Sequence, residues 1–257
     1  MENRASLKTK LSDNILTVML DHLVPYTQCV GALREVMQEV YDNSAVKGVI
    51  ITGTEQHTFS MGASPNEMQG LNELNGRKFT EHGQEVFSLI EGCHKPILAA
   101  INGNVQSGGL ALALACHLRV AVEQATFCFP EVTMGVIPHF GSTQRLTHLI
   151  GKTKALEFMM MGIPITAMEA KRLKLINHVV DDRETLMQKG ETILKHITMH
   201  APLAVGMLIN CINAVHNNKE GGYQIEANSF SHCFKTEDLK EGILAKLEDR
   251  SPIFQGK

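Results

Sequence analysis

Residues 102–109, NGNVQSGG, form the stretch of this chain best suited to chemistry. Their glycines and amides indicate a loop, and the apolar residues 110–116 predict a helix directly after it. Backbone N–H groups at a helix N-terminus bind negatively charged oxygens. Residues 49–68, VIITGTEQHTFSMGASPNEM, repeat the order of strand, glycine loop and helix. Two such loops that converge would make an oxyanion hole, although glycine turns after strands are also common structural features of α/β proteins.

The elements that must position these loops alternate between strands and helices through most of the chain. Apolar runs and alternation predict strands within residues 6–21, 46–53, 95–103 and 117–131. Helical spacing predicts helices at 30–43, 76–93 and 143–162, and a helix that runs into a strand at 166–180. From residue 184 onward nearly everything predicts helices, with a break at Ala201-Pro202. This order indicates a parallel sheet with a helical C-terminal layer.

The bulk composition excludes several classes of protein. The chain has 257 residues and a formal net charge of −3, and it lacks the long basic run typical of nucleic-acid binding. Its apolar runs fall far short of the ~18 residues that a membrane helix needs. Its first ten residues lack the apolar core of a signal peptide. Six cysteines without metal-binding spacing indicate free thiols, no metal site and a cytoplasmic location.

Four segments, in this order, resemble motifs of the crotonase superfamily, also called the enoyl-CoA hydratase/isomerase family. They are TFSMGAS (58–64), KPILAAINGNVQSGG (95–109), FCFPEVTMGVIPHFGSTQRL (127–146) and EANSF…KTEDLKEGILAKLEDRSPIF (226–254). The resemblance implies an α/β fold with a crotonase-like ββα spiral core and a helical C-terminal layer. It places the core and its acyl-thioester site in residues 1–195, and an oligomerisation region in residues 196–257.

Family members stabilise the enolate that forms at a thioester carbonyl, and the resemblance assigns this chemistry to particular residues. The two donors of the oxyanion hole match the backbone N–H groups of Ala63 and Gly108. Coenzyme A or phosphopantetheine belongs to the substrate, so no separate cofactor is expected. Substrate contacts are expected at Gly62, Ser64, Met68, Gly109, Ala111, Met134 and Phe140.

Hydratases of this family use two carboxylates, and this chain keeps one of them. The first position matches Ala111, and the second matches Glu131. Two carboxylates are needed to position and activate a water, whereas one suffices to carry a proton between two carbons. The pattern therefore favours isomerase-like proton transfer by Glu131 over efficient hydration. His139, eight residues further along, is either a second catalytic acid/base or a loop histidine.

Departures from the family pattern leave other functions open. Ser64 stands where the family has Asp, and Ser64-Pro65-Asn66 carries no cation that could bind the phosphates of CoA. The N-terminal stretch also lacks the N-R-P…N-A pattern that helps to form the nucleotide-binding edge. One alternative is a decarboxylase or dehydratase acting on a thioester of an acyl carrier protein in polyketide biosynthesis. Another is a catalytically silent thioester-binding protein, which the missing carboxylate at Ala111 favours.

The C-terminal residues predict self-association, because family members assemble as trimers or paired trimers through this region. Residues 227–247 carry more apolar side chains than an exposed helical pair would, so we expect a homotrimer or hexamer. His117 and Arg145 are expected to have structural roles. The Met-rich residues 157–162 are expected to belong to the core rather than to an acyl-chain channel.

Overall fold

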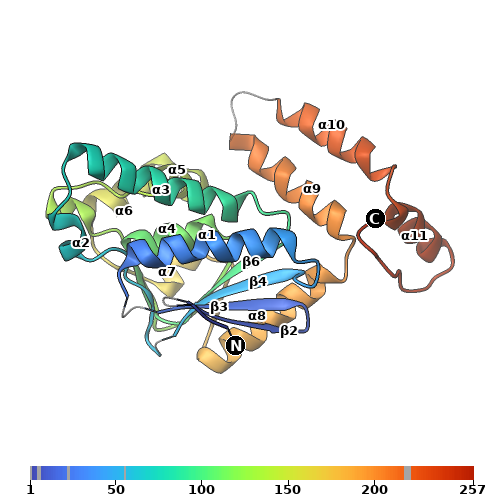
Figure 1. Cartoon of the computed structure of the whole chain (residues 1–257), viewed down its shortest axis with the longest axis horizontal. Coiled ribbons are helices and arrows are strands. Elements are labelled where there is room, and N and C mark those ends of the chain that lie inside the picture. Colours follow the sequence, from blue (N-terminus) through green and yellow to red (C-terminus); the bar gives the residue numbers. More distant parts are fainter. Residues whose placement is uncertain (1, 5–6, 22–23, 55, 217–220) are drawn as a thin grey trace.

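A large sheet with the spatial order β1-β2-β3-β4-β6-β8-β11 forms the centre of the protein (Figure 1). The computed structural model describes residues 2–4, 7–21, 24–54, 56–216 and 221–257. Pairing is antiparallel from β1 to β3 and parallel from β3 to β11. Asp13 and Asn14 form the predicted turn between β2 and β3, and both have positive φ. The strands are β1 (Glu2–Arg4), β2 (Leu7–Ser12), β3 (Ile15–Leu20), β4 (Gly48–Gly53), β6 (Ile97–Ile101), β8 (Leu118–Val122) and β11 (His178–Val180).

A smaller sheet has the order β10-β9-β7-β5. The chain alternates between the two sheets: β4, β6 and β8 each join the large sheet, and the strand that follows each of them joins the small one. Helices follow each such pair of strands, so the core is the predicted ββα spiral and the predicted fold class is confirmed. The small-sheet strands are β5 (Thr58–Ser60), β7 (Asn104–Gln106), β9 (Thr126–Cys128) and β10 (Ile165–Thr166).

Three small-sheet strands lie where the sequence predicted none. β5, β7 and β10 have three, three and two residues, which is too short to show a strand pattern. β7 matters most, because it lies inside the predicted glycine loop. Val105 at its centre pairs with Ser60 on one side and Phe127 on the other. The prediction of a continuous loop over residues 102–109 was therefore wrong for residues 104–106, whose backbone belongs to the sheet, and for residues 107–109, which form the start of a helix.

Helix α4 (Ser107–Ala115) starts directly after β7, and every one of its residues is buried. It packs on the small sheet through β5, β7 and β9, and on the neighbouring helices α3 and α5. α8 covers the large sheet at β4, β6 and β8. The helices before the C-terminal region are α1 (Tyr26–Asp42), α2 (Pro65–Gln69), α3 (Glu73–Glu91), the 3₁₀ turn η1 (Glu131–Met134), α5 (Ser142–Ile150), α6 (Lys152–Met161), α7 (Ala167–Arg172) and α8 (Arg183–Thr198).

Helices α9 (Pro202–Asn213), α10 (Gly222–Cys233) and α11 (Glu237–Leu247) extend away from the two sheets (Figure 1). The 3₁₀ turn η2 (Ala214–His216) follows α9. Pro202 is the first residue of α9, as the predicted break requires. The side-chain amide of Asn213 donates to the Glu91 carbonyl at 2.7 Å and ties α9 to the end of α3. Within the described ranges no single helix is long and apolar enough to cross a membrane, and the pair α8–α9, which passes by length and composition, bends by 106°.

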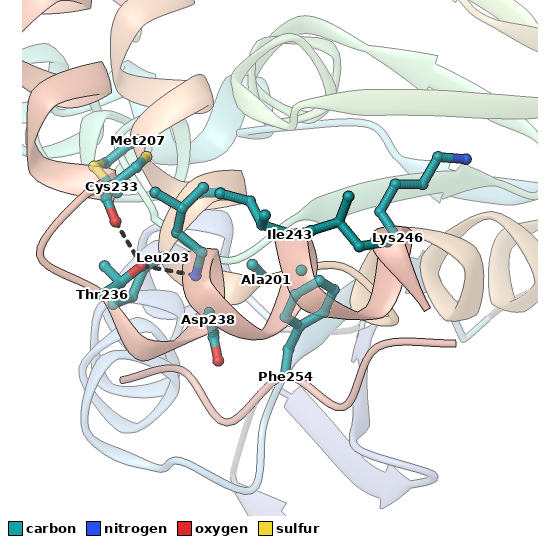
Figure 2. A pocket seen from close by; sticks show the side chains of 13 residues that line it. Ala201, Leu203, Met207, Cys233, Thr236, Asp238, Ile243, Lys246 and Phe254 are labelled. Atoms are coloured by element: carbon teal, nitrogen blue, oxygen red, sulfur yellow. Dashed lines mark hydrogen bonds between the residues drawn. The ribbon is translucent and has the colours of Figure 1, made fainter. Parts of the chain in front are cut away.

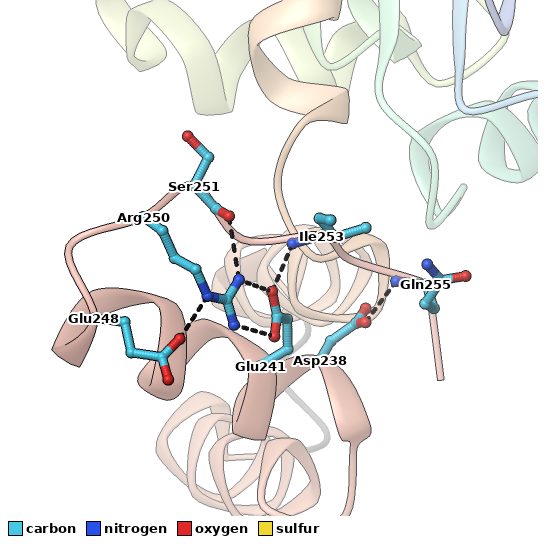
Figure 3. Close-up of polar contacts among 7 residues, drawn as sticks. All are labelled: Asp238, Glu241, Glu248, Arg250, Ser251, Ile253 and Gln255. Atoms are coloured by element: carbon cyan, nitrogen blue, oxygen red, sulfur yellow. Dashed lines mark hydrogen bonds and ion pairs between the residues drawn. The ribbon is translucent and has the colours of Figure 1, made fainter.

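The chain after α11 folds back onto that helix (Figure 3). The Asp238 carboxylate accepts the backbone N–H groups of Gln255 at 2.7 Å and Gly256 at 2.9 Å. Glu241 forms a two-point ion pair with Arg250 at 2.7 and 2.9 Å. The returning tail also brings Phe254 to an apolar cavity of about 440 Å³ between α9 and α11 (Figure 2). The last helix and the tail therefore form one packed unit.

Candidate active site

Two glycine loops meet where β5 and β7 end side by side. These strands run parallel, so the residues after each of them leave the small sheet at the same edge. Gly62 turns with a φ of +74°, and a Cβ atom on it would lie 2.5 Å from the backbone nitrogen of Gly108. Only glycine fits such an approach. The backbone of Ala63, the next residue, is therefore brought up to the start of α4.

Packing against other elements explains why Gly108 and Gly109, in the first turn of α4, are glycines. A Cβ atom on Gly108 would lie 2.5 Å from the ring of Tyr26, and one on Gly109 would lie 2.3 Å from the carbonyl oxygen of Ser60. The Tyr26 hydroxyl, from the start of α1, also donates to the Gly108 carbonyl at 2.6 Å. A side chain at either glycine would separate α4 from α1 or β5 and displace the N–H groups of the loop.

A cavity of about 380 Å³ lies in front of the two loops. Gly62, Ala63, Ser64 and Ser107 line it from the loops, and Met134 lines it from η1. This volume lies within the range of small-molecule sites, ~300–1,000 Å³. None of the described residues that line it is Lys, Arg or His. The cavity is thus suited to a neutral, partly apolar group.

Glu131 is fully buried, and it is the first residue of η1, shortly after β9 in the sequence. Neither of its carboxylate oxygens has a hydrogen-bond partner among the described residues. Burial raises the pKa of Glu131 above its ordinary value, and the neighbouring Ser107 hydroxyl counteracts part of the rise. Ser107 Oγ and the Glu131 carboxylate oxygens nevertheless form no hydrogen bond of ordinary geometry with each other. A carboxyl group with a raised pKa can both take up and release a proton at moderate pH.

His139 is the nearest ionisable neighbour recorded for Glu131, with Nδ1 3.8 Å from Glu131 Oε1. Its side chain is 11% exposed, and Nε2 has no hydrogen-bond partner within the described part of the chain. Burial lowers the pKa of His139 to about 4, so the ring is neutral at physiological pH and forms no ion pair. Its ring lies 4.2 Å from that of Phe140 and 5.4 Å from that of Phe79.

Four of the residues expected to contact substrate stand outside the cavity wall. Gly109, Ala111 and Phe140 are buried behind it, and Met68 lies half-buried on α2. Ala111 lies one turn after Ser107 and so on the same face of α4. No residue of α4 is acidic, so this helix brings no second carboxylate toward Glu131.

The two residues with expected structural roles have them. The Ile97 N–H donates to Nδ1 of His117 at 2.9 Å, and Nε2 of His117 lies 3.1 Å from the Glu91 carbonyl oxygen. Arg145 pairs with the Glu91 carboxylate at 2.9 Å. The prediction that residues 157–162 belong to the core was wrong for Met160 and Met161, which are 65% and 53% exposed.

Three residues of the site were not predicted from the sequence. Tyr26 supports Gly108, Asp21 carries a carboxylate on the cavity wall, and Ser107 lines the cavity close to Glu131. Tyr26 and Asp21 come from the N-terminal segment, which reaches the loops only through tertiary packing. Ser107 stands where the family motif has the first of three glycines, which was the available signal, and the structure gives it the positive φ, +50°, of a glycine position.

Comparison with known proteins identifies the family. The sequence profile described as enoyl-CoA hydratase/isomerase matches residues 26–257. The chain belongs to the enoyl-CoA hydratase/isomerase family. It is 36% identical to a probable enoyl-CoA hydratase of Bacillus subtilis over 95% of this chain and 97% of that protein. It is 38% identical to the crotonyl-CoA hydratase of Syntrophomonas wolfei over 88% of this chain and 86% of that protein.

Solved structures agree with this assignment. The crystal structure of an enoyl-CoA hydratase from Bacillus anthracis superposes with a TM-score of 0.91 at 29% identity, and the match covers 98% of this chain and 100% of that one. The protein is therefore an enzyme of the hydratase/isomerase family. An acyl-CoA thioester substrate is consistent with membership of that family.

Proposed function

We propose that this enzyme moves a proton on an enoyl thioester, with Glu131 as the acid/base. The N–H groups of Ala63 and Gly108 hold the thioester oxygen while negative charge develops on it, and one such donor contributes about 3 kcal/mol to transition-state stabilisation. Glu131 takes a proton from one carbon of the acyl chain and returns it to another. The observation that carries this proposal is the buried, unpartnered Glu131 carboxyl, whose neighbour Ser107 begins the helix that carries Gly108.

Hydration is the weaker activity in this proposal. Ala111 presents a methyl group on α4, where a second carboxylate would be needed to hold and activate water. Two other groups could orient a water: His139, which is neutral and lies 3.8 Å from Glu131, and Asp21, whose carboxyl group lines the cavity. Relatives of this chain are named as hydratases. The rate of hydration must therefore be measured directly, not inferred from the family.

The substrate enters without any separate cofactor, because CoA or phosphopantetheine is part of it. Gly62, Ser64 and Met134 line the cavity and contact the thioester and the first carbons of the acyl chain. The other expected contact residues do not line the cavity and support its wall indirectly: Gly109, Ala111, Met68 and Phe140.

A second candidate is a decarboxylase or dehydratase that acts on a thioester bound to an acyl carrier protein. The absence of Lys, Arg and His from the described cavity wall favours a pantetheine arm without an adenine nucleotide. Loss of CO₂ from a thioester that carries a carboxyl group on its α-carbon (a 2-carboxyacyl thioester) leaves a thioester enolate, which the two N–H groups would stabilise and Glu131 would protonate.

A turnover screen tests these candidates. 3-Enoyl, 2-enoyl and 2-carboxyacyl thioesters are each supplied as CoA and as carrier-protein forms, to the natural enzyme and to Glu131→Gln. Isomerisation of 3-enoyl-CoA that is lost in the variant supports the first proposal, and turnover of carrier-bound forms alone supports the second. Ligand-induced thermal stabilisation without turnover of any thioester would instead indicate a silent binding protein.

We further propose that residues 196–257 are an oligomerisation region of a homotrimer or hexamer, next to a catalytic core of residues 1–195. The support is a set of exposed apolar side chains on the C-terminal helices, with Phe230 67% and Leu247 79% exposed. The proposed boundary falls inside α8, which ends at Thr198. A cytoplasmic location is proposed because all six cysteines are free thiols.

A further inference from the structure

Ser107 holds a backbone conformation that side chains rarely adopt. Its φ is +50°, in the left-handed region where glycine is favoured. Residues in this region are retained when the surrounding structure holds them there, and they concentrate at functional sites. The hydroxyl of Ser107 therefore calls for an explanation.

Ser107 lines the cavity, and its hydroxyl also neighbours Glu131. Ser107 is only 5% exposed, and its Oγ has no hydrogen-bond partner among the described residues. Glu131 does not line the cavity, and both of its oxygens are equally unpartnered. Unpaired buried polar groups are rare and costly in folded proteins. Here they occur together, one on the wall and one behind it.

We propose that Ser107 is a positioning residue whose hydroxyl orients the Glu131 carboxyl and links it to the cavity. The inference rests on the proposed role of Glu131 as the acid/base. A hydroxyl both donates and accepts hydrogen bonds. It donates to Glu131 when the carboxylate is ionised, and it accepts from Glu131 when the carboxyl is protonated. The reacting group is thus held in one orientation through both halves of the proton transfer.

Other titratable groups near Glu131 do not replace this hydroxyl. His139 faces Glu131 from the segment before α5, but it is neutral because burial lowers its pKa to about 4. Cys128 at the end of β9 is held as a neutral thiol by burial, which raises its pKa to about 11. Lys152, Lys154 and Glu157 of α6, the helix that packs on η1, are exposed to solvent. Ser107 is accordingly the polar side chain that favours the ionised form of Glu131, and the backbone of Glu131 itself acts in the same direction.

Ser107→Ala and Ser107→Gly together separate the hydroxyl from the backbone. Both variants remove Oγ, but alanine keeps the strained φ and glycine relaxes it. The first measurement is a ¹³C NMR titration of side-chain carboxyls, with the Glu131 signal assigned by its absence in Glu131→Gln. We expect the pKa of Glu131 to rise by about one unit in both variants, because a hydrogen bond to the charged form is lost. This readout does not depend on turnover.

The second measurement is the pH profile of kcat and KM on the substrate found by the screen. We expect the acidic limb of kcat to move to higher pH in both variants, with kcat about tenfold lower on that limb and KM changed less than about twofold. Lys174→Gly, which relaxes an exposed residue with a φ of +62° far along the chain, controls for backbone relief alone.

The possible results separate the two proposals. An unchanged Glu131 pKa in both Ser107 variants overturns the positioning role. So does a wild-type profile in Ser107→Gly combined with a shifted one in Ser107→Ala, because the effect then comes from the backbone. A shifted Glu131 pKa in an enzyme that turns over no thioester supports the Ser107–Glu131 link and overturns the proposed function instead.

Discussion

At the scale of single residues, the site is defined by polar groups that the fold buries without partners. Ser107, Glu131 and His139 each carry such atoms, and they are the buried unpartnered side chains of the described residues. Burial drives both ionisable members toward the neutral form, since it raises the pKa of Glu131 and lowers that of His139. A carboxyl group with a raised pKa beside a neutral imidazole, in a dry site, is suited to exchanging protons with a bound ligand.

Replacement of Glu131 by Gln keeps the shape of the side chain but removes its proton. We expect kcat to fall by about 10²-fold or more, the scale of a lost general base, with substrate affinity changed only a few fold. Steady-state kinetics and equilibrium binding of a non-reactive thioester check this. Glu157→Gln, an exposed carboxylate on α6, is the matched control and should retain full activity. An unchanged kcat in Glu131→Gln would transfer the proton chemistry to His139 or to the substrate.

The raised pKa of Glu131 also makes stability depend on pH. Because the folded-state pKa lies above the unfolded one, the protonated carboxyl favours the fold at low pH, and this advantage is lost as pH rises through the folded-state pKa. Glu131→Gln has no such loss. We therefore expect its melting temperature relative to the natural enzyme to increase from about pH 5 to about pH 8. A difference that is constant with pH, measured by calorimetry, would contradict the raised pKa.

Ala111→Glu tests the idea that a second carboxylate is what hydration lacks. Position 111 lies on the same face of α4 as the cavity-lining Ser107. We expect the added carboxyl to raise the rate of water addition to a crotonyl thioester, together with a loss of stability because Ala111 is fully buried. Hydration is followed by the loss of enoyl absorbance. Robust hydration by the natural enzyme would show that another group, such as His139, already holds the water.

At the scale of elements, the sequence predicted what depends on local pattern. The buried strands β4 and β6, the turn at Asp13-Asn14 and the break at Pro202 are where they were expected, because apolar runs and turn residues specify them. β7 was not predicted, because its three residues pair only with strands distant in sequence. Tyr26 was missed for the same reason: its contact with Gly108 is made by tertiary packing.

The close packing of α4 on β5, where Gly109 meets Ser60, can be tested at the scale of elements. Gly109→Ala would place a Cβ atom 2.3 Å from the Ser60 carbonyl oxygen, so β5 and α4 must move apart. We expect a loss of about 1–3 kcal/mol in the free energy of unfolding and a marked loss of activity as the loops shift. Gly31→Ala, inside α1 with no atom within 4 Å of the new Cβ, should instead gain up to about 1 kcal/mol. Equal effects at both positions in denaturant titrations would contradict this close packing.

At the scale of the whole molecule, the helices α9 to α11 leave apolar surface uncovered. Phe230 on α10 and Phe234 directly after it are 67% and 60% exposed, and their rings meet edge to face with centroids 5.3 Å apart. We expect the natural chain to be trimeric or hexameric, and Phe230→Ser with Phe234→Ser to shift it toward monomer. Sedimentation velocity at micromolar concentration checks this, with Leu74→Ser, an exposed residue of α3, as the control. A natural chain that sediments as a monomer would remove the proposed assembly.

The hydrogen bond from Tyr26 to Gly108 joins residues 82 positions apart. Closing so long a stretch of chain costs conformational entropy, and proteins rich in such distant contacts fold slowly. The candidate site therefore cannot be complete before α1 and α4 have docked on each other, which isolated early helices do not achieve. During refolding, the capacity to bind ligand should return with the slowest phase of native packing. The chain has three tyrosines and no tryptophan, so tyrosine fluorescence, to which Tyr26 contributes, offers a label-free signal for that phase.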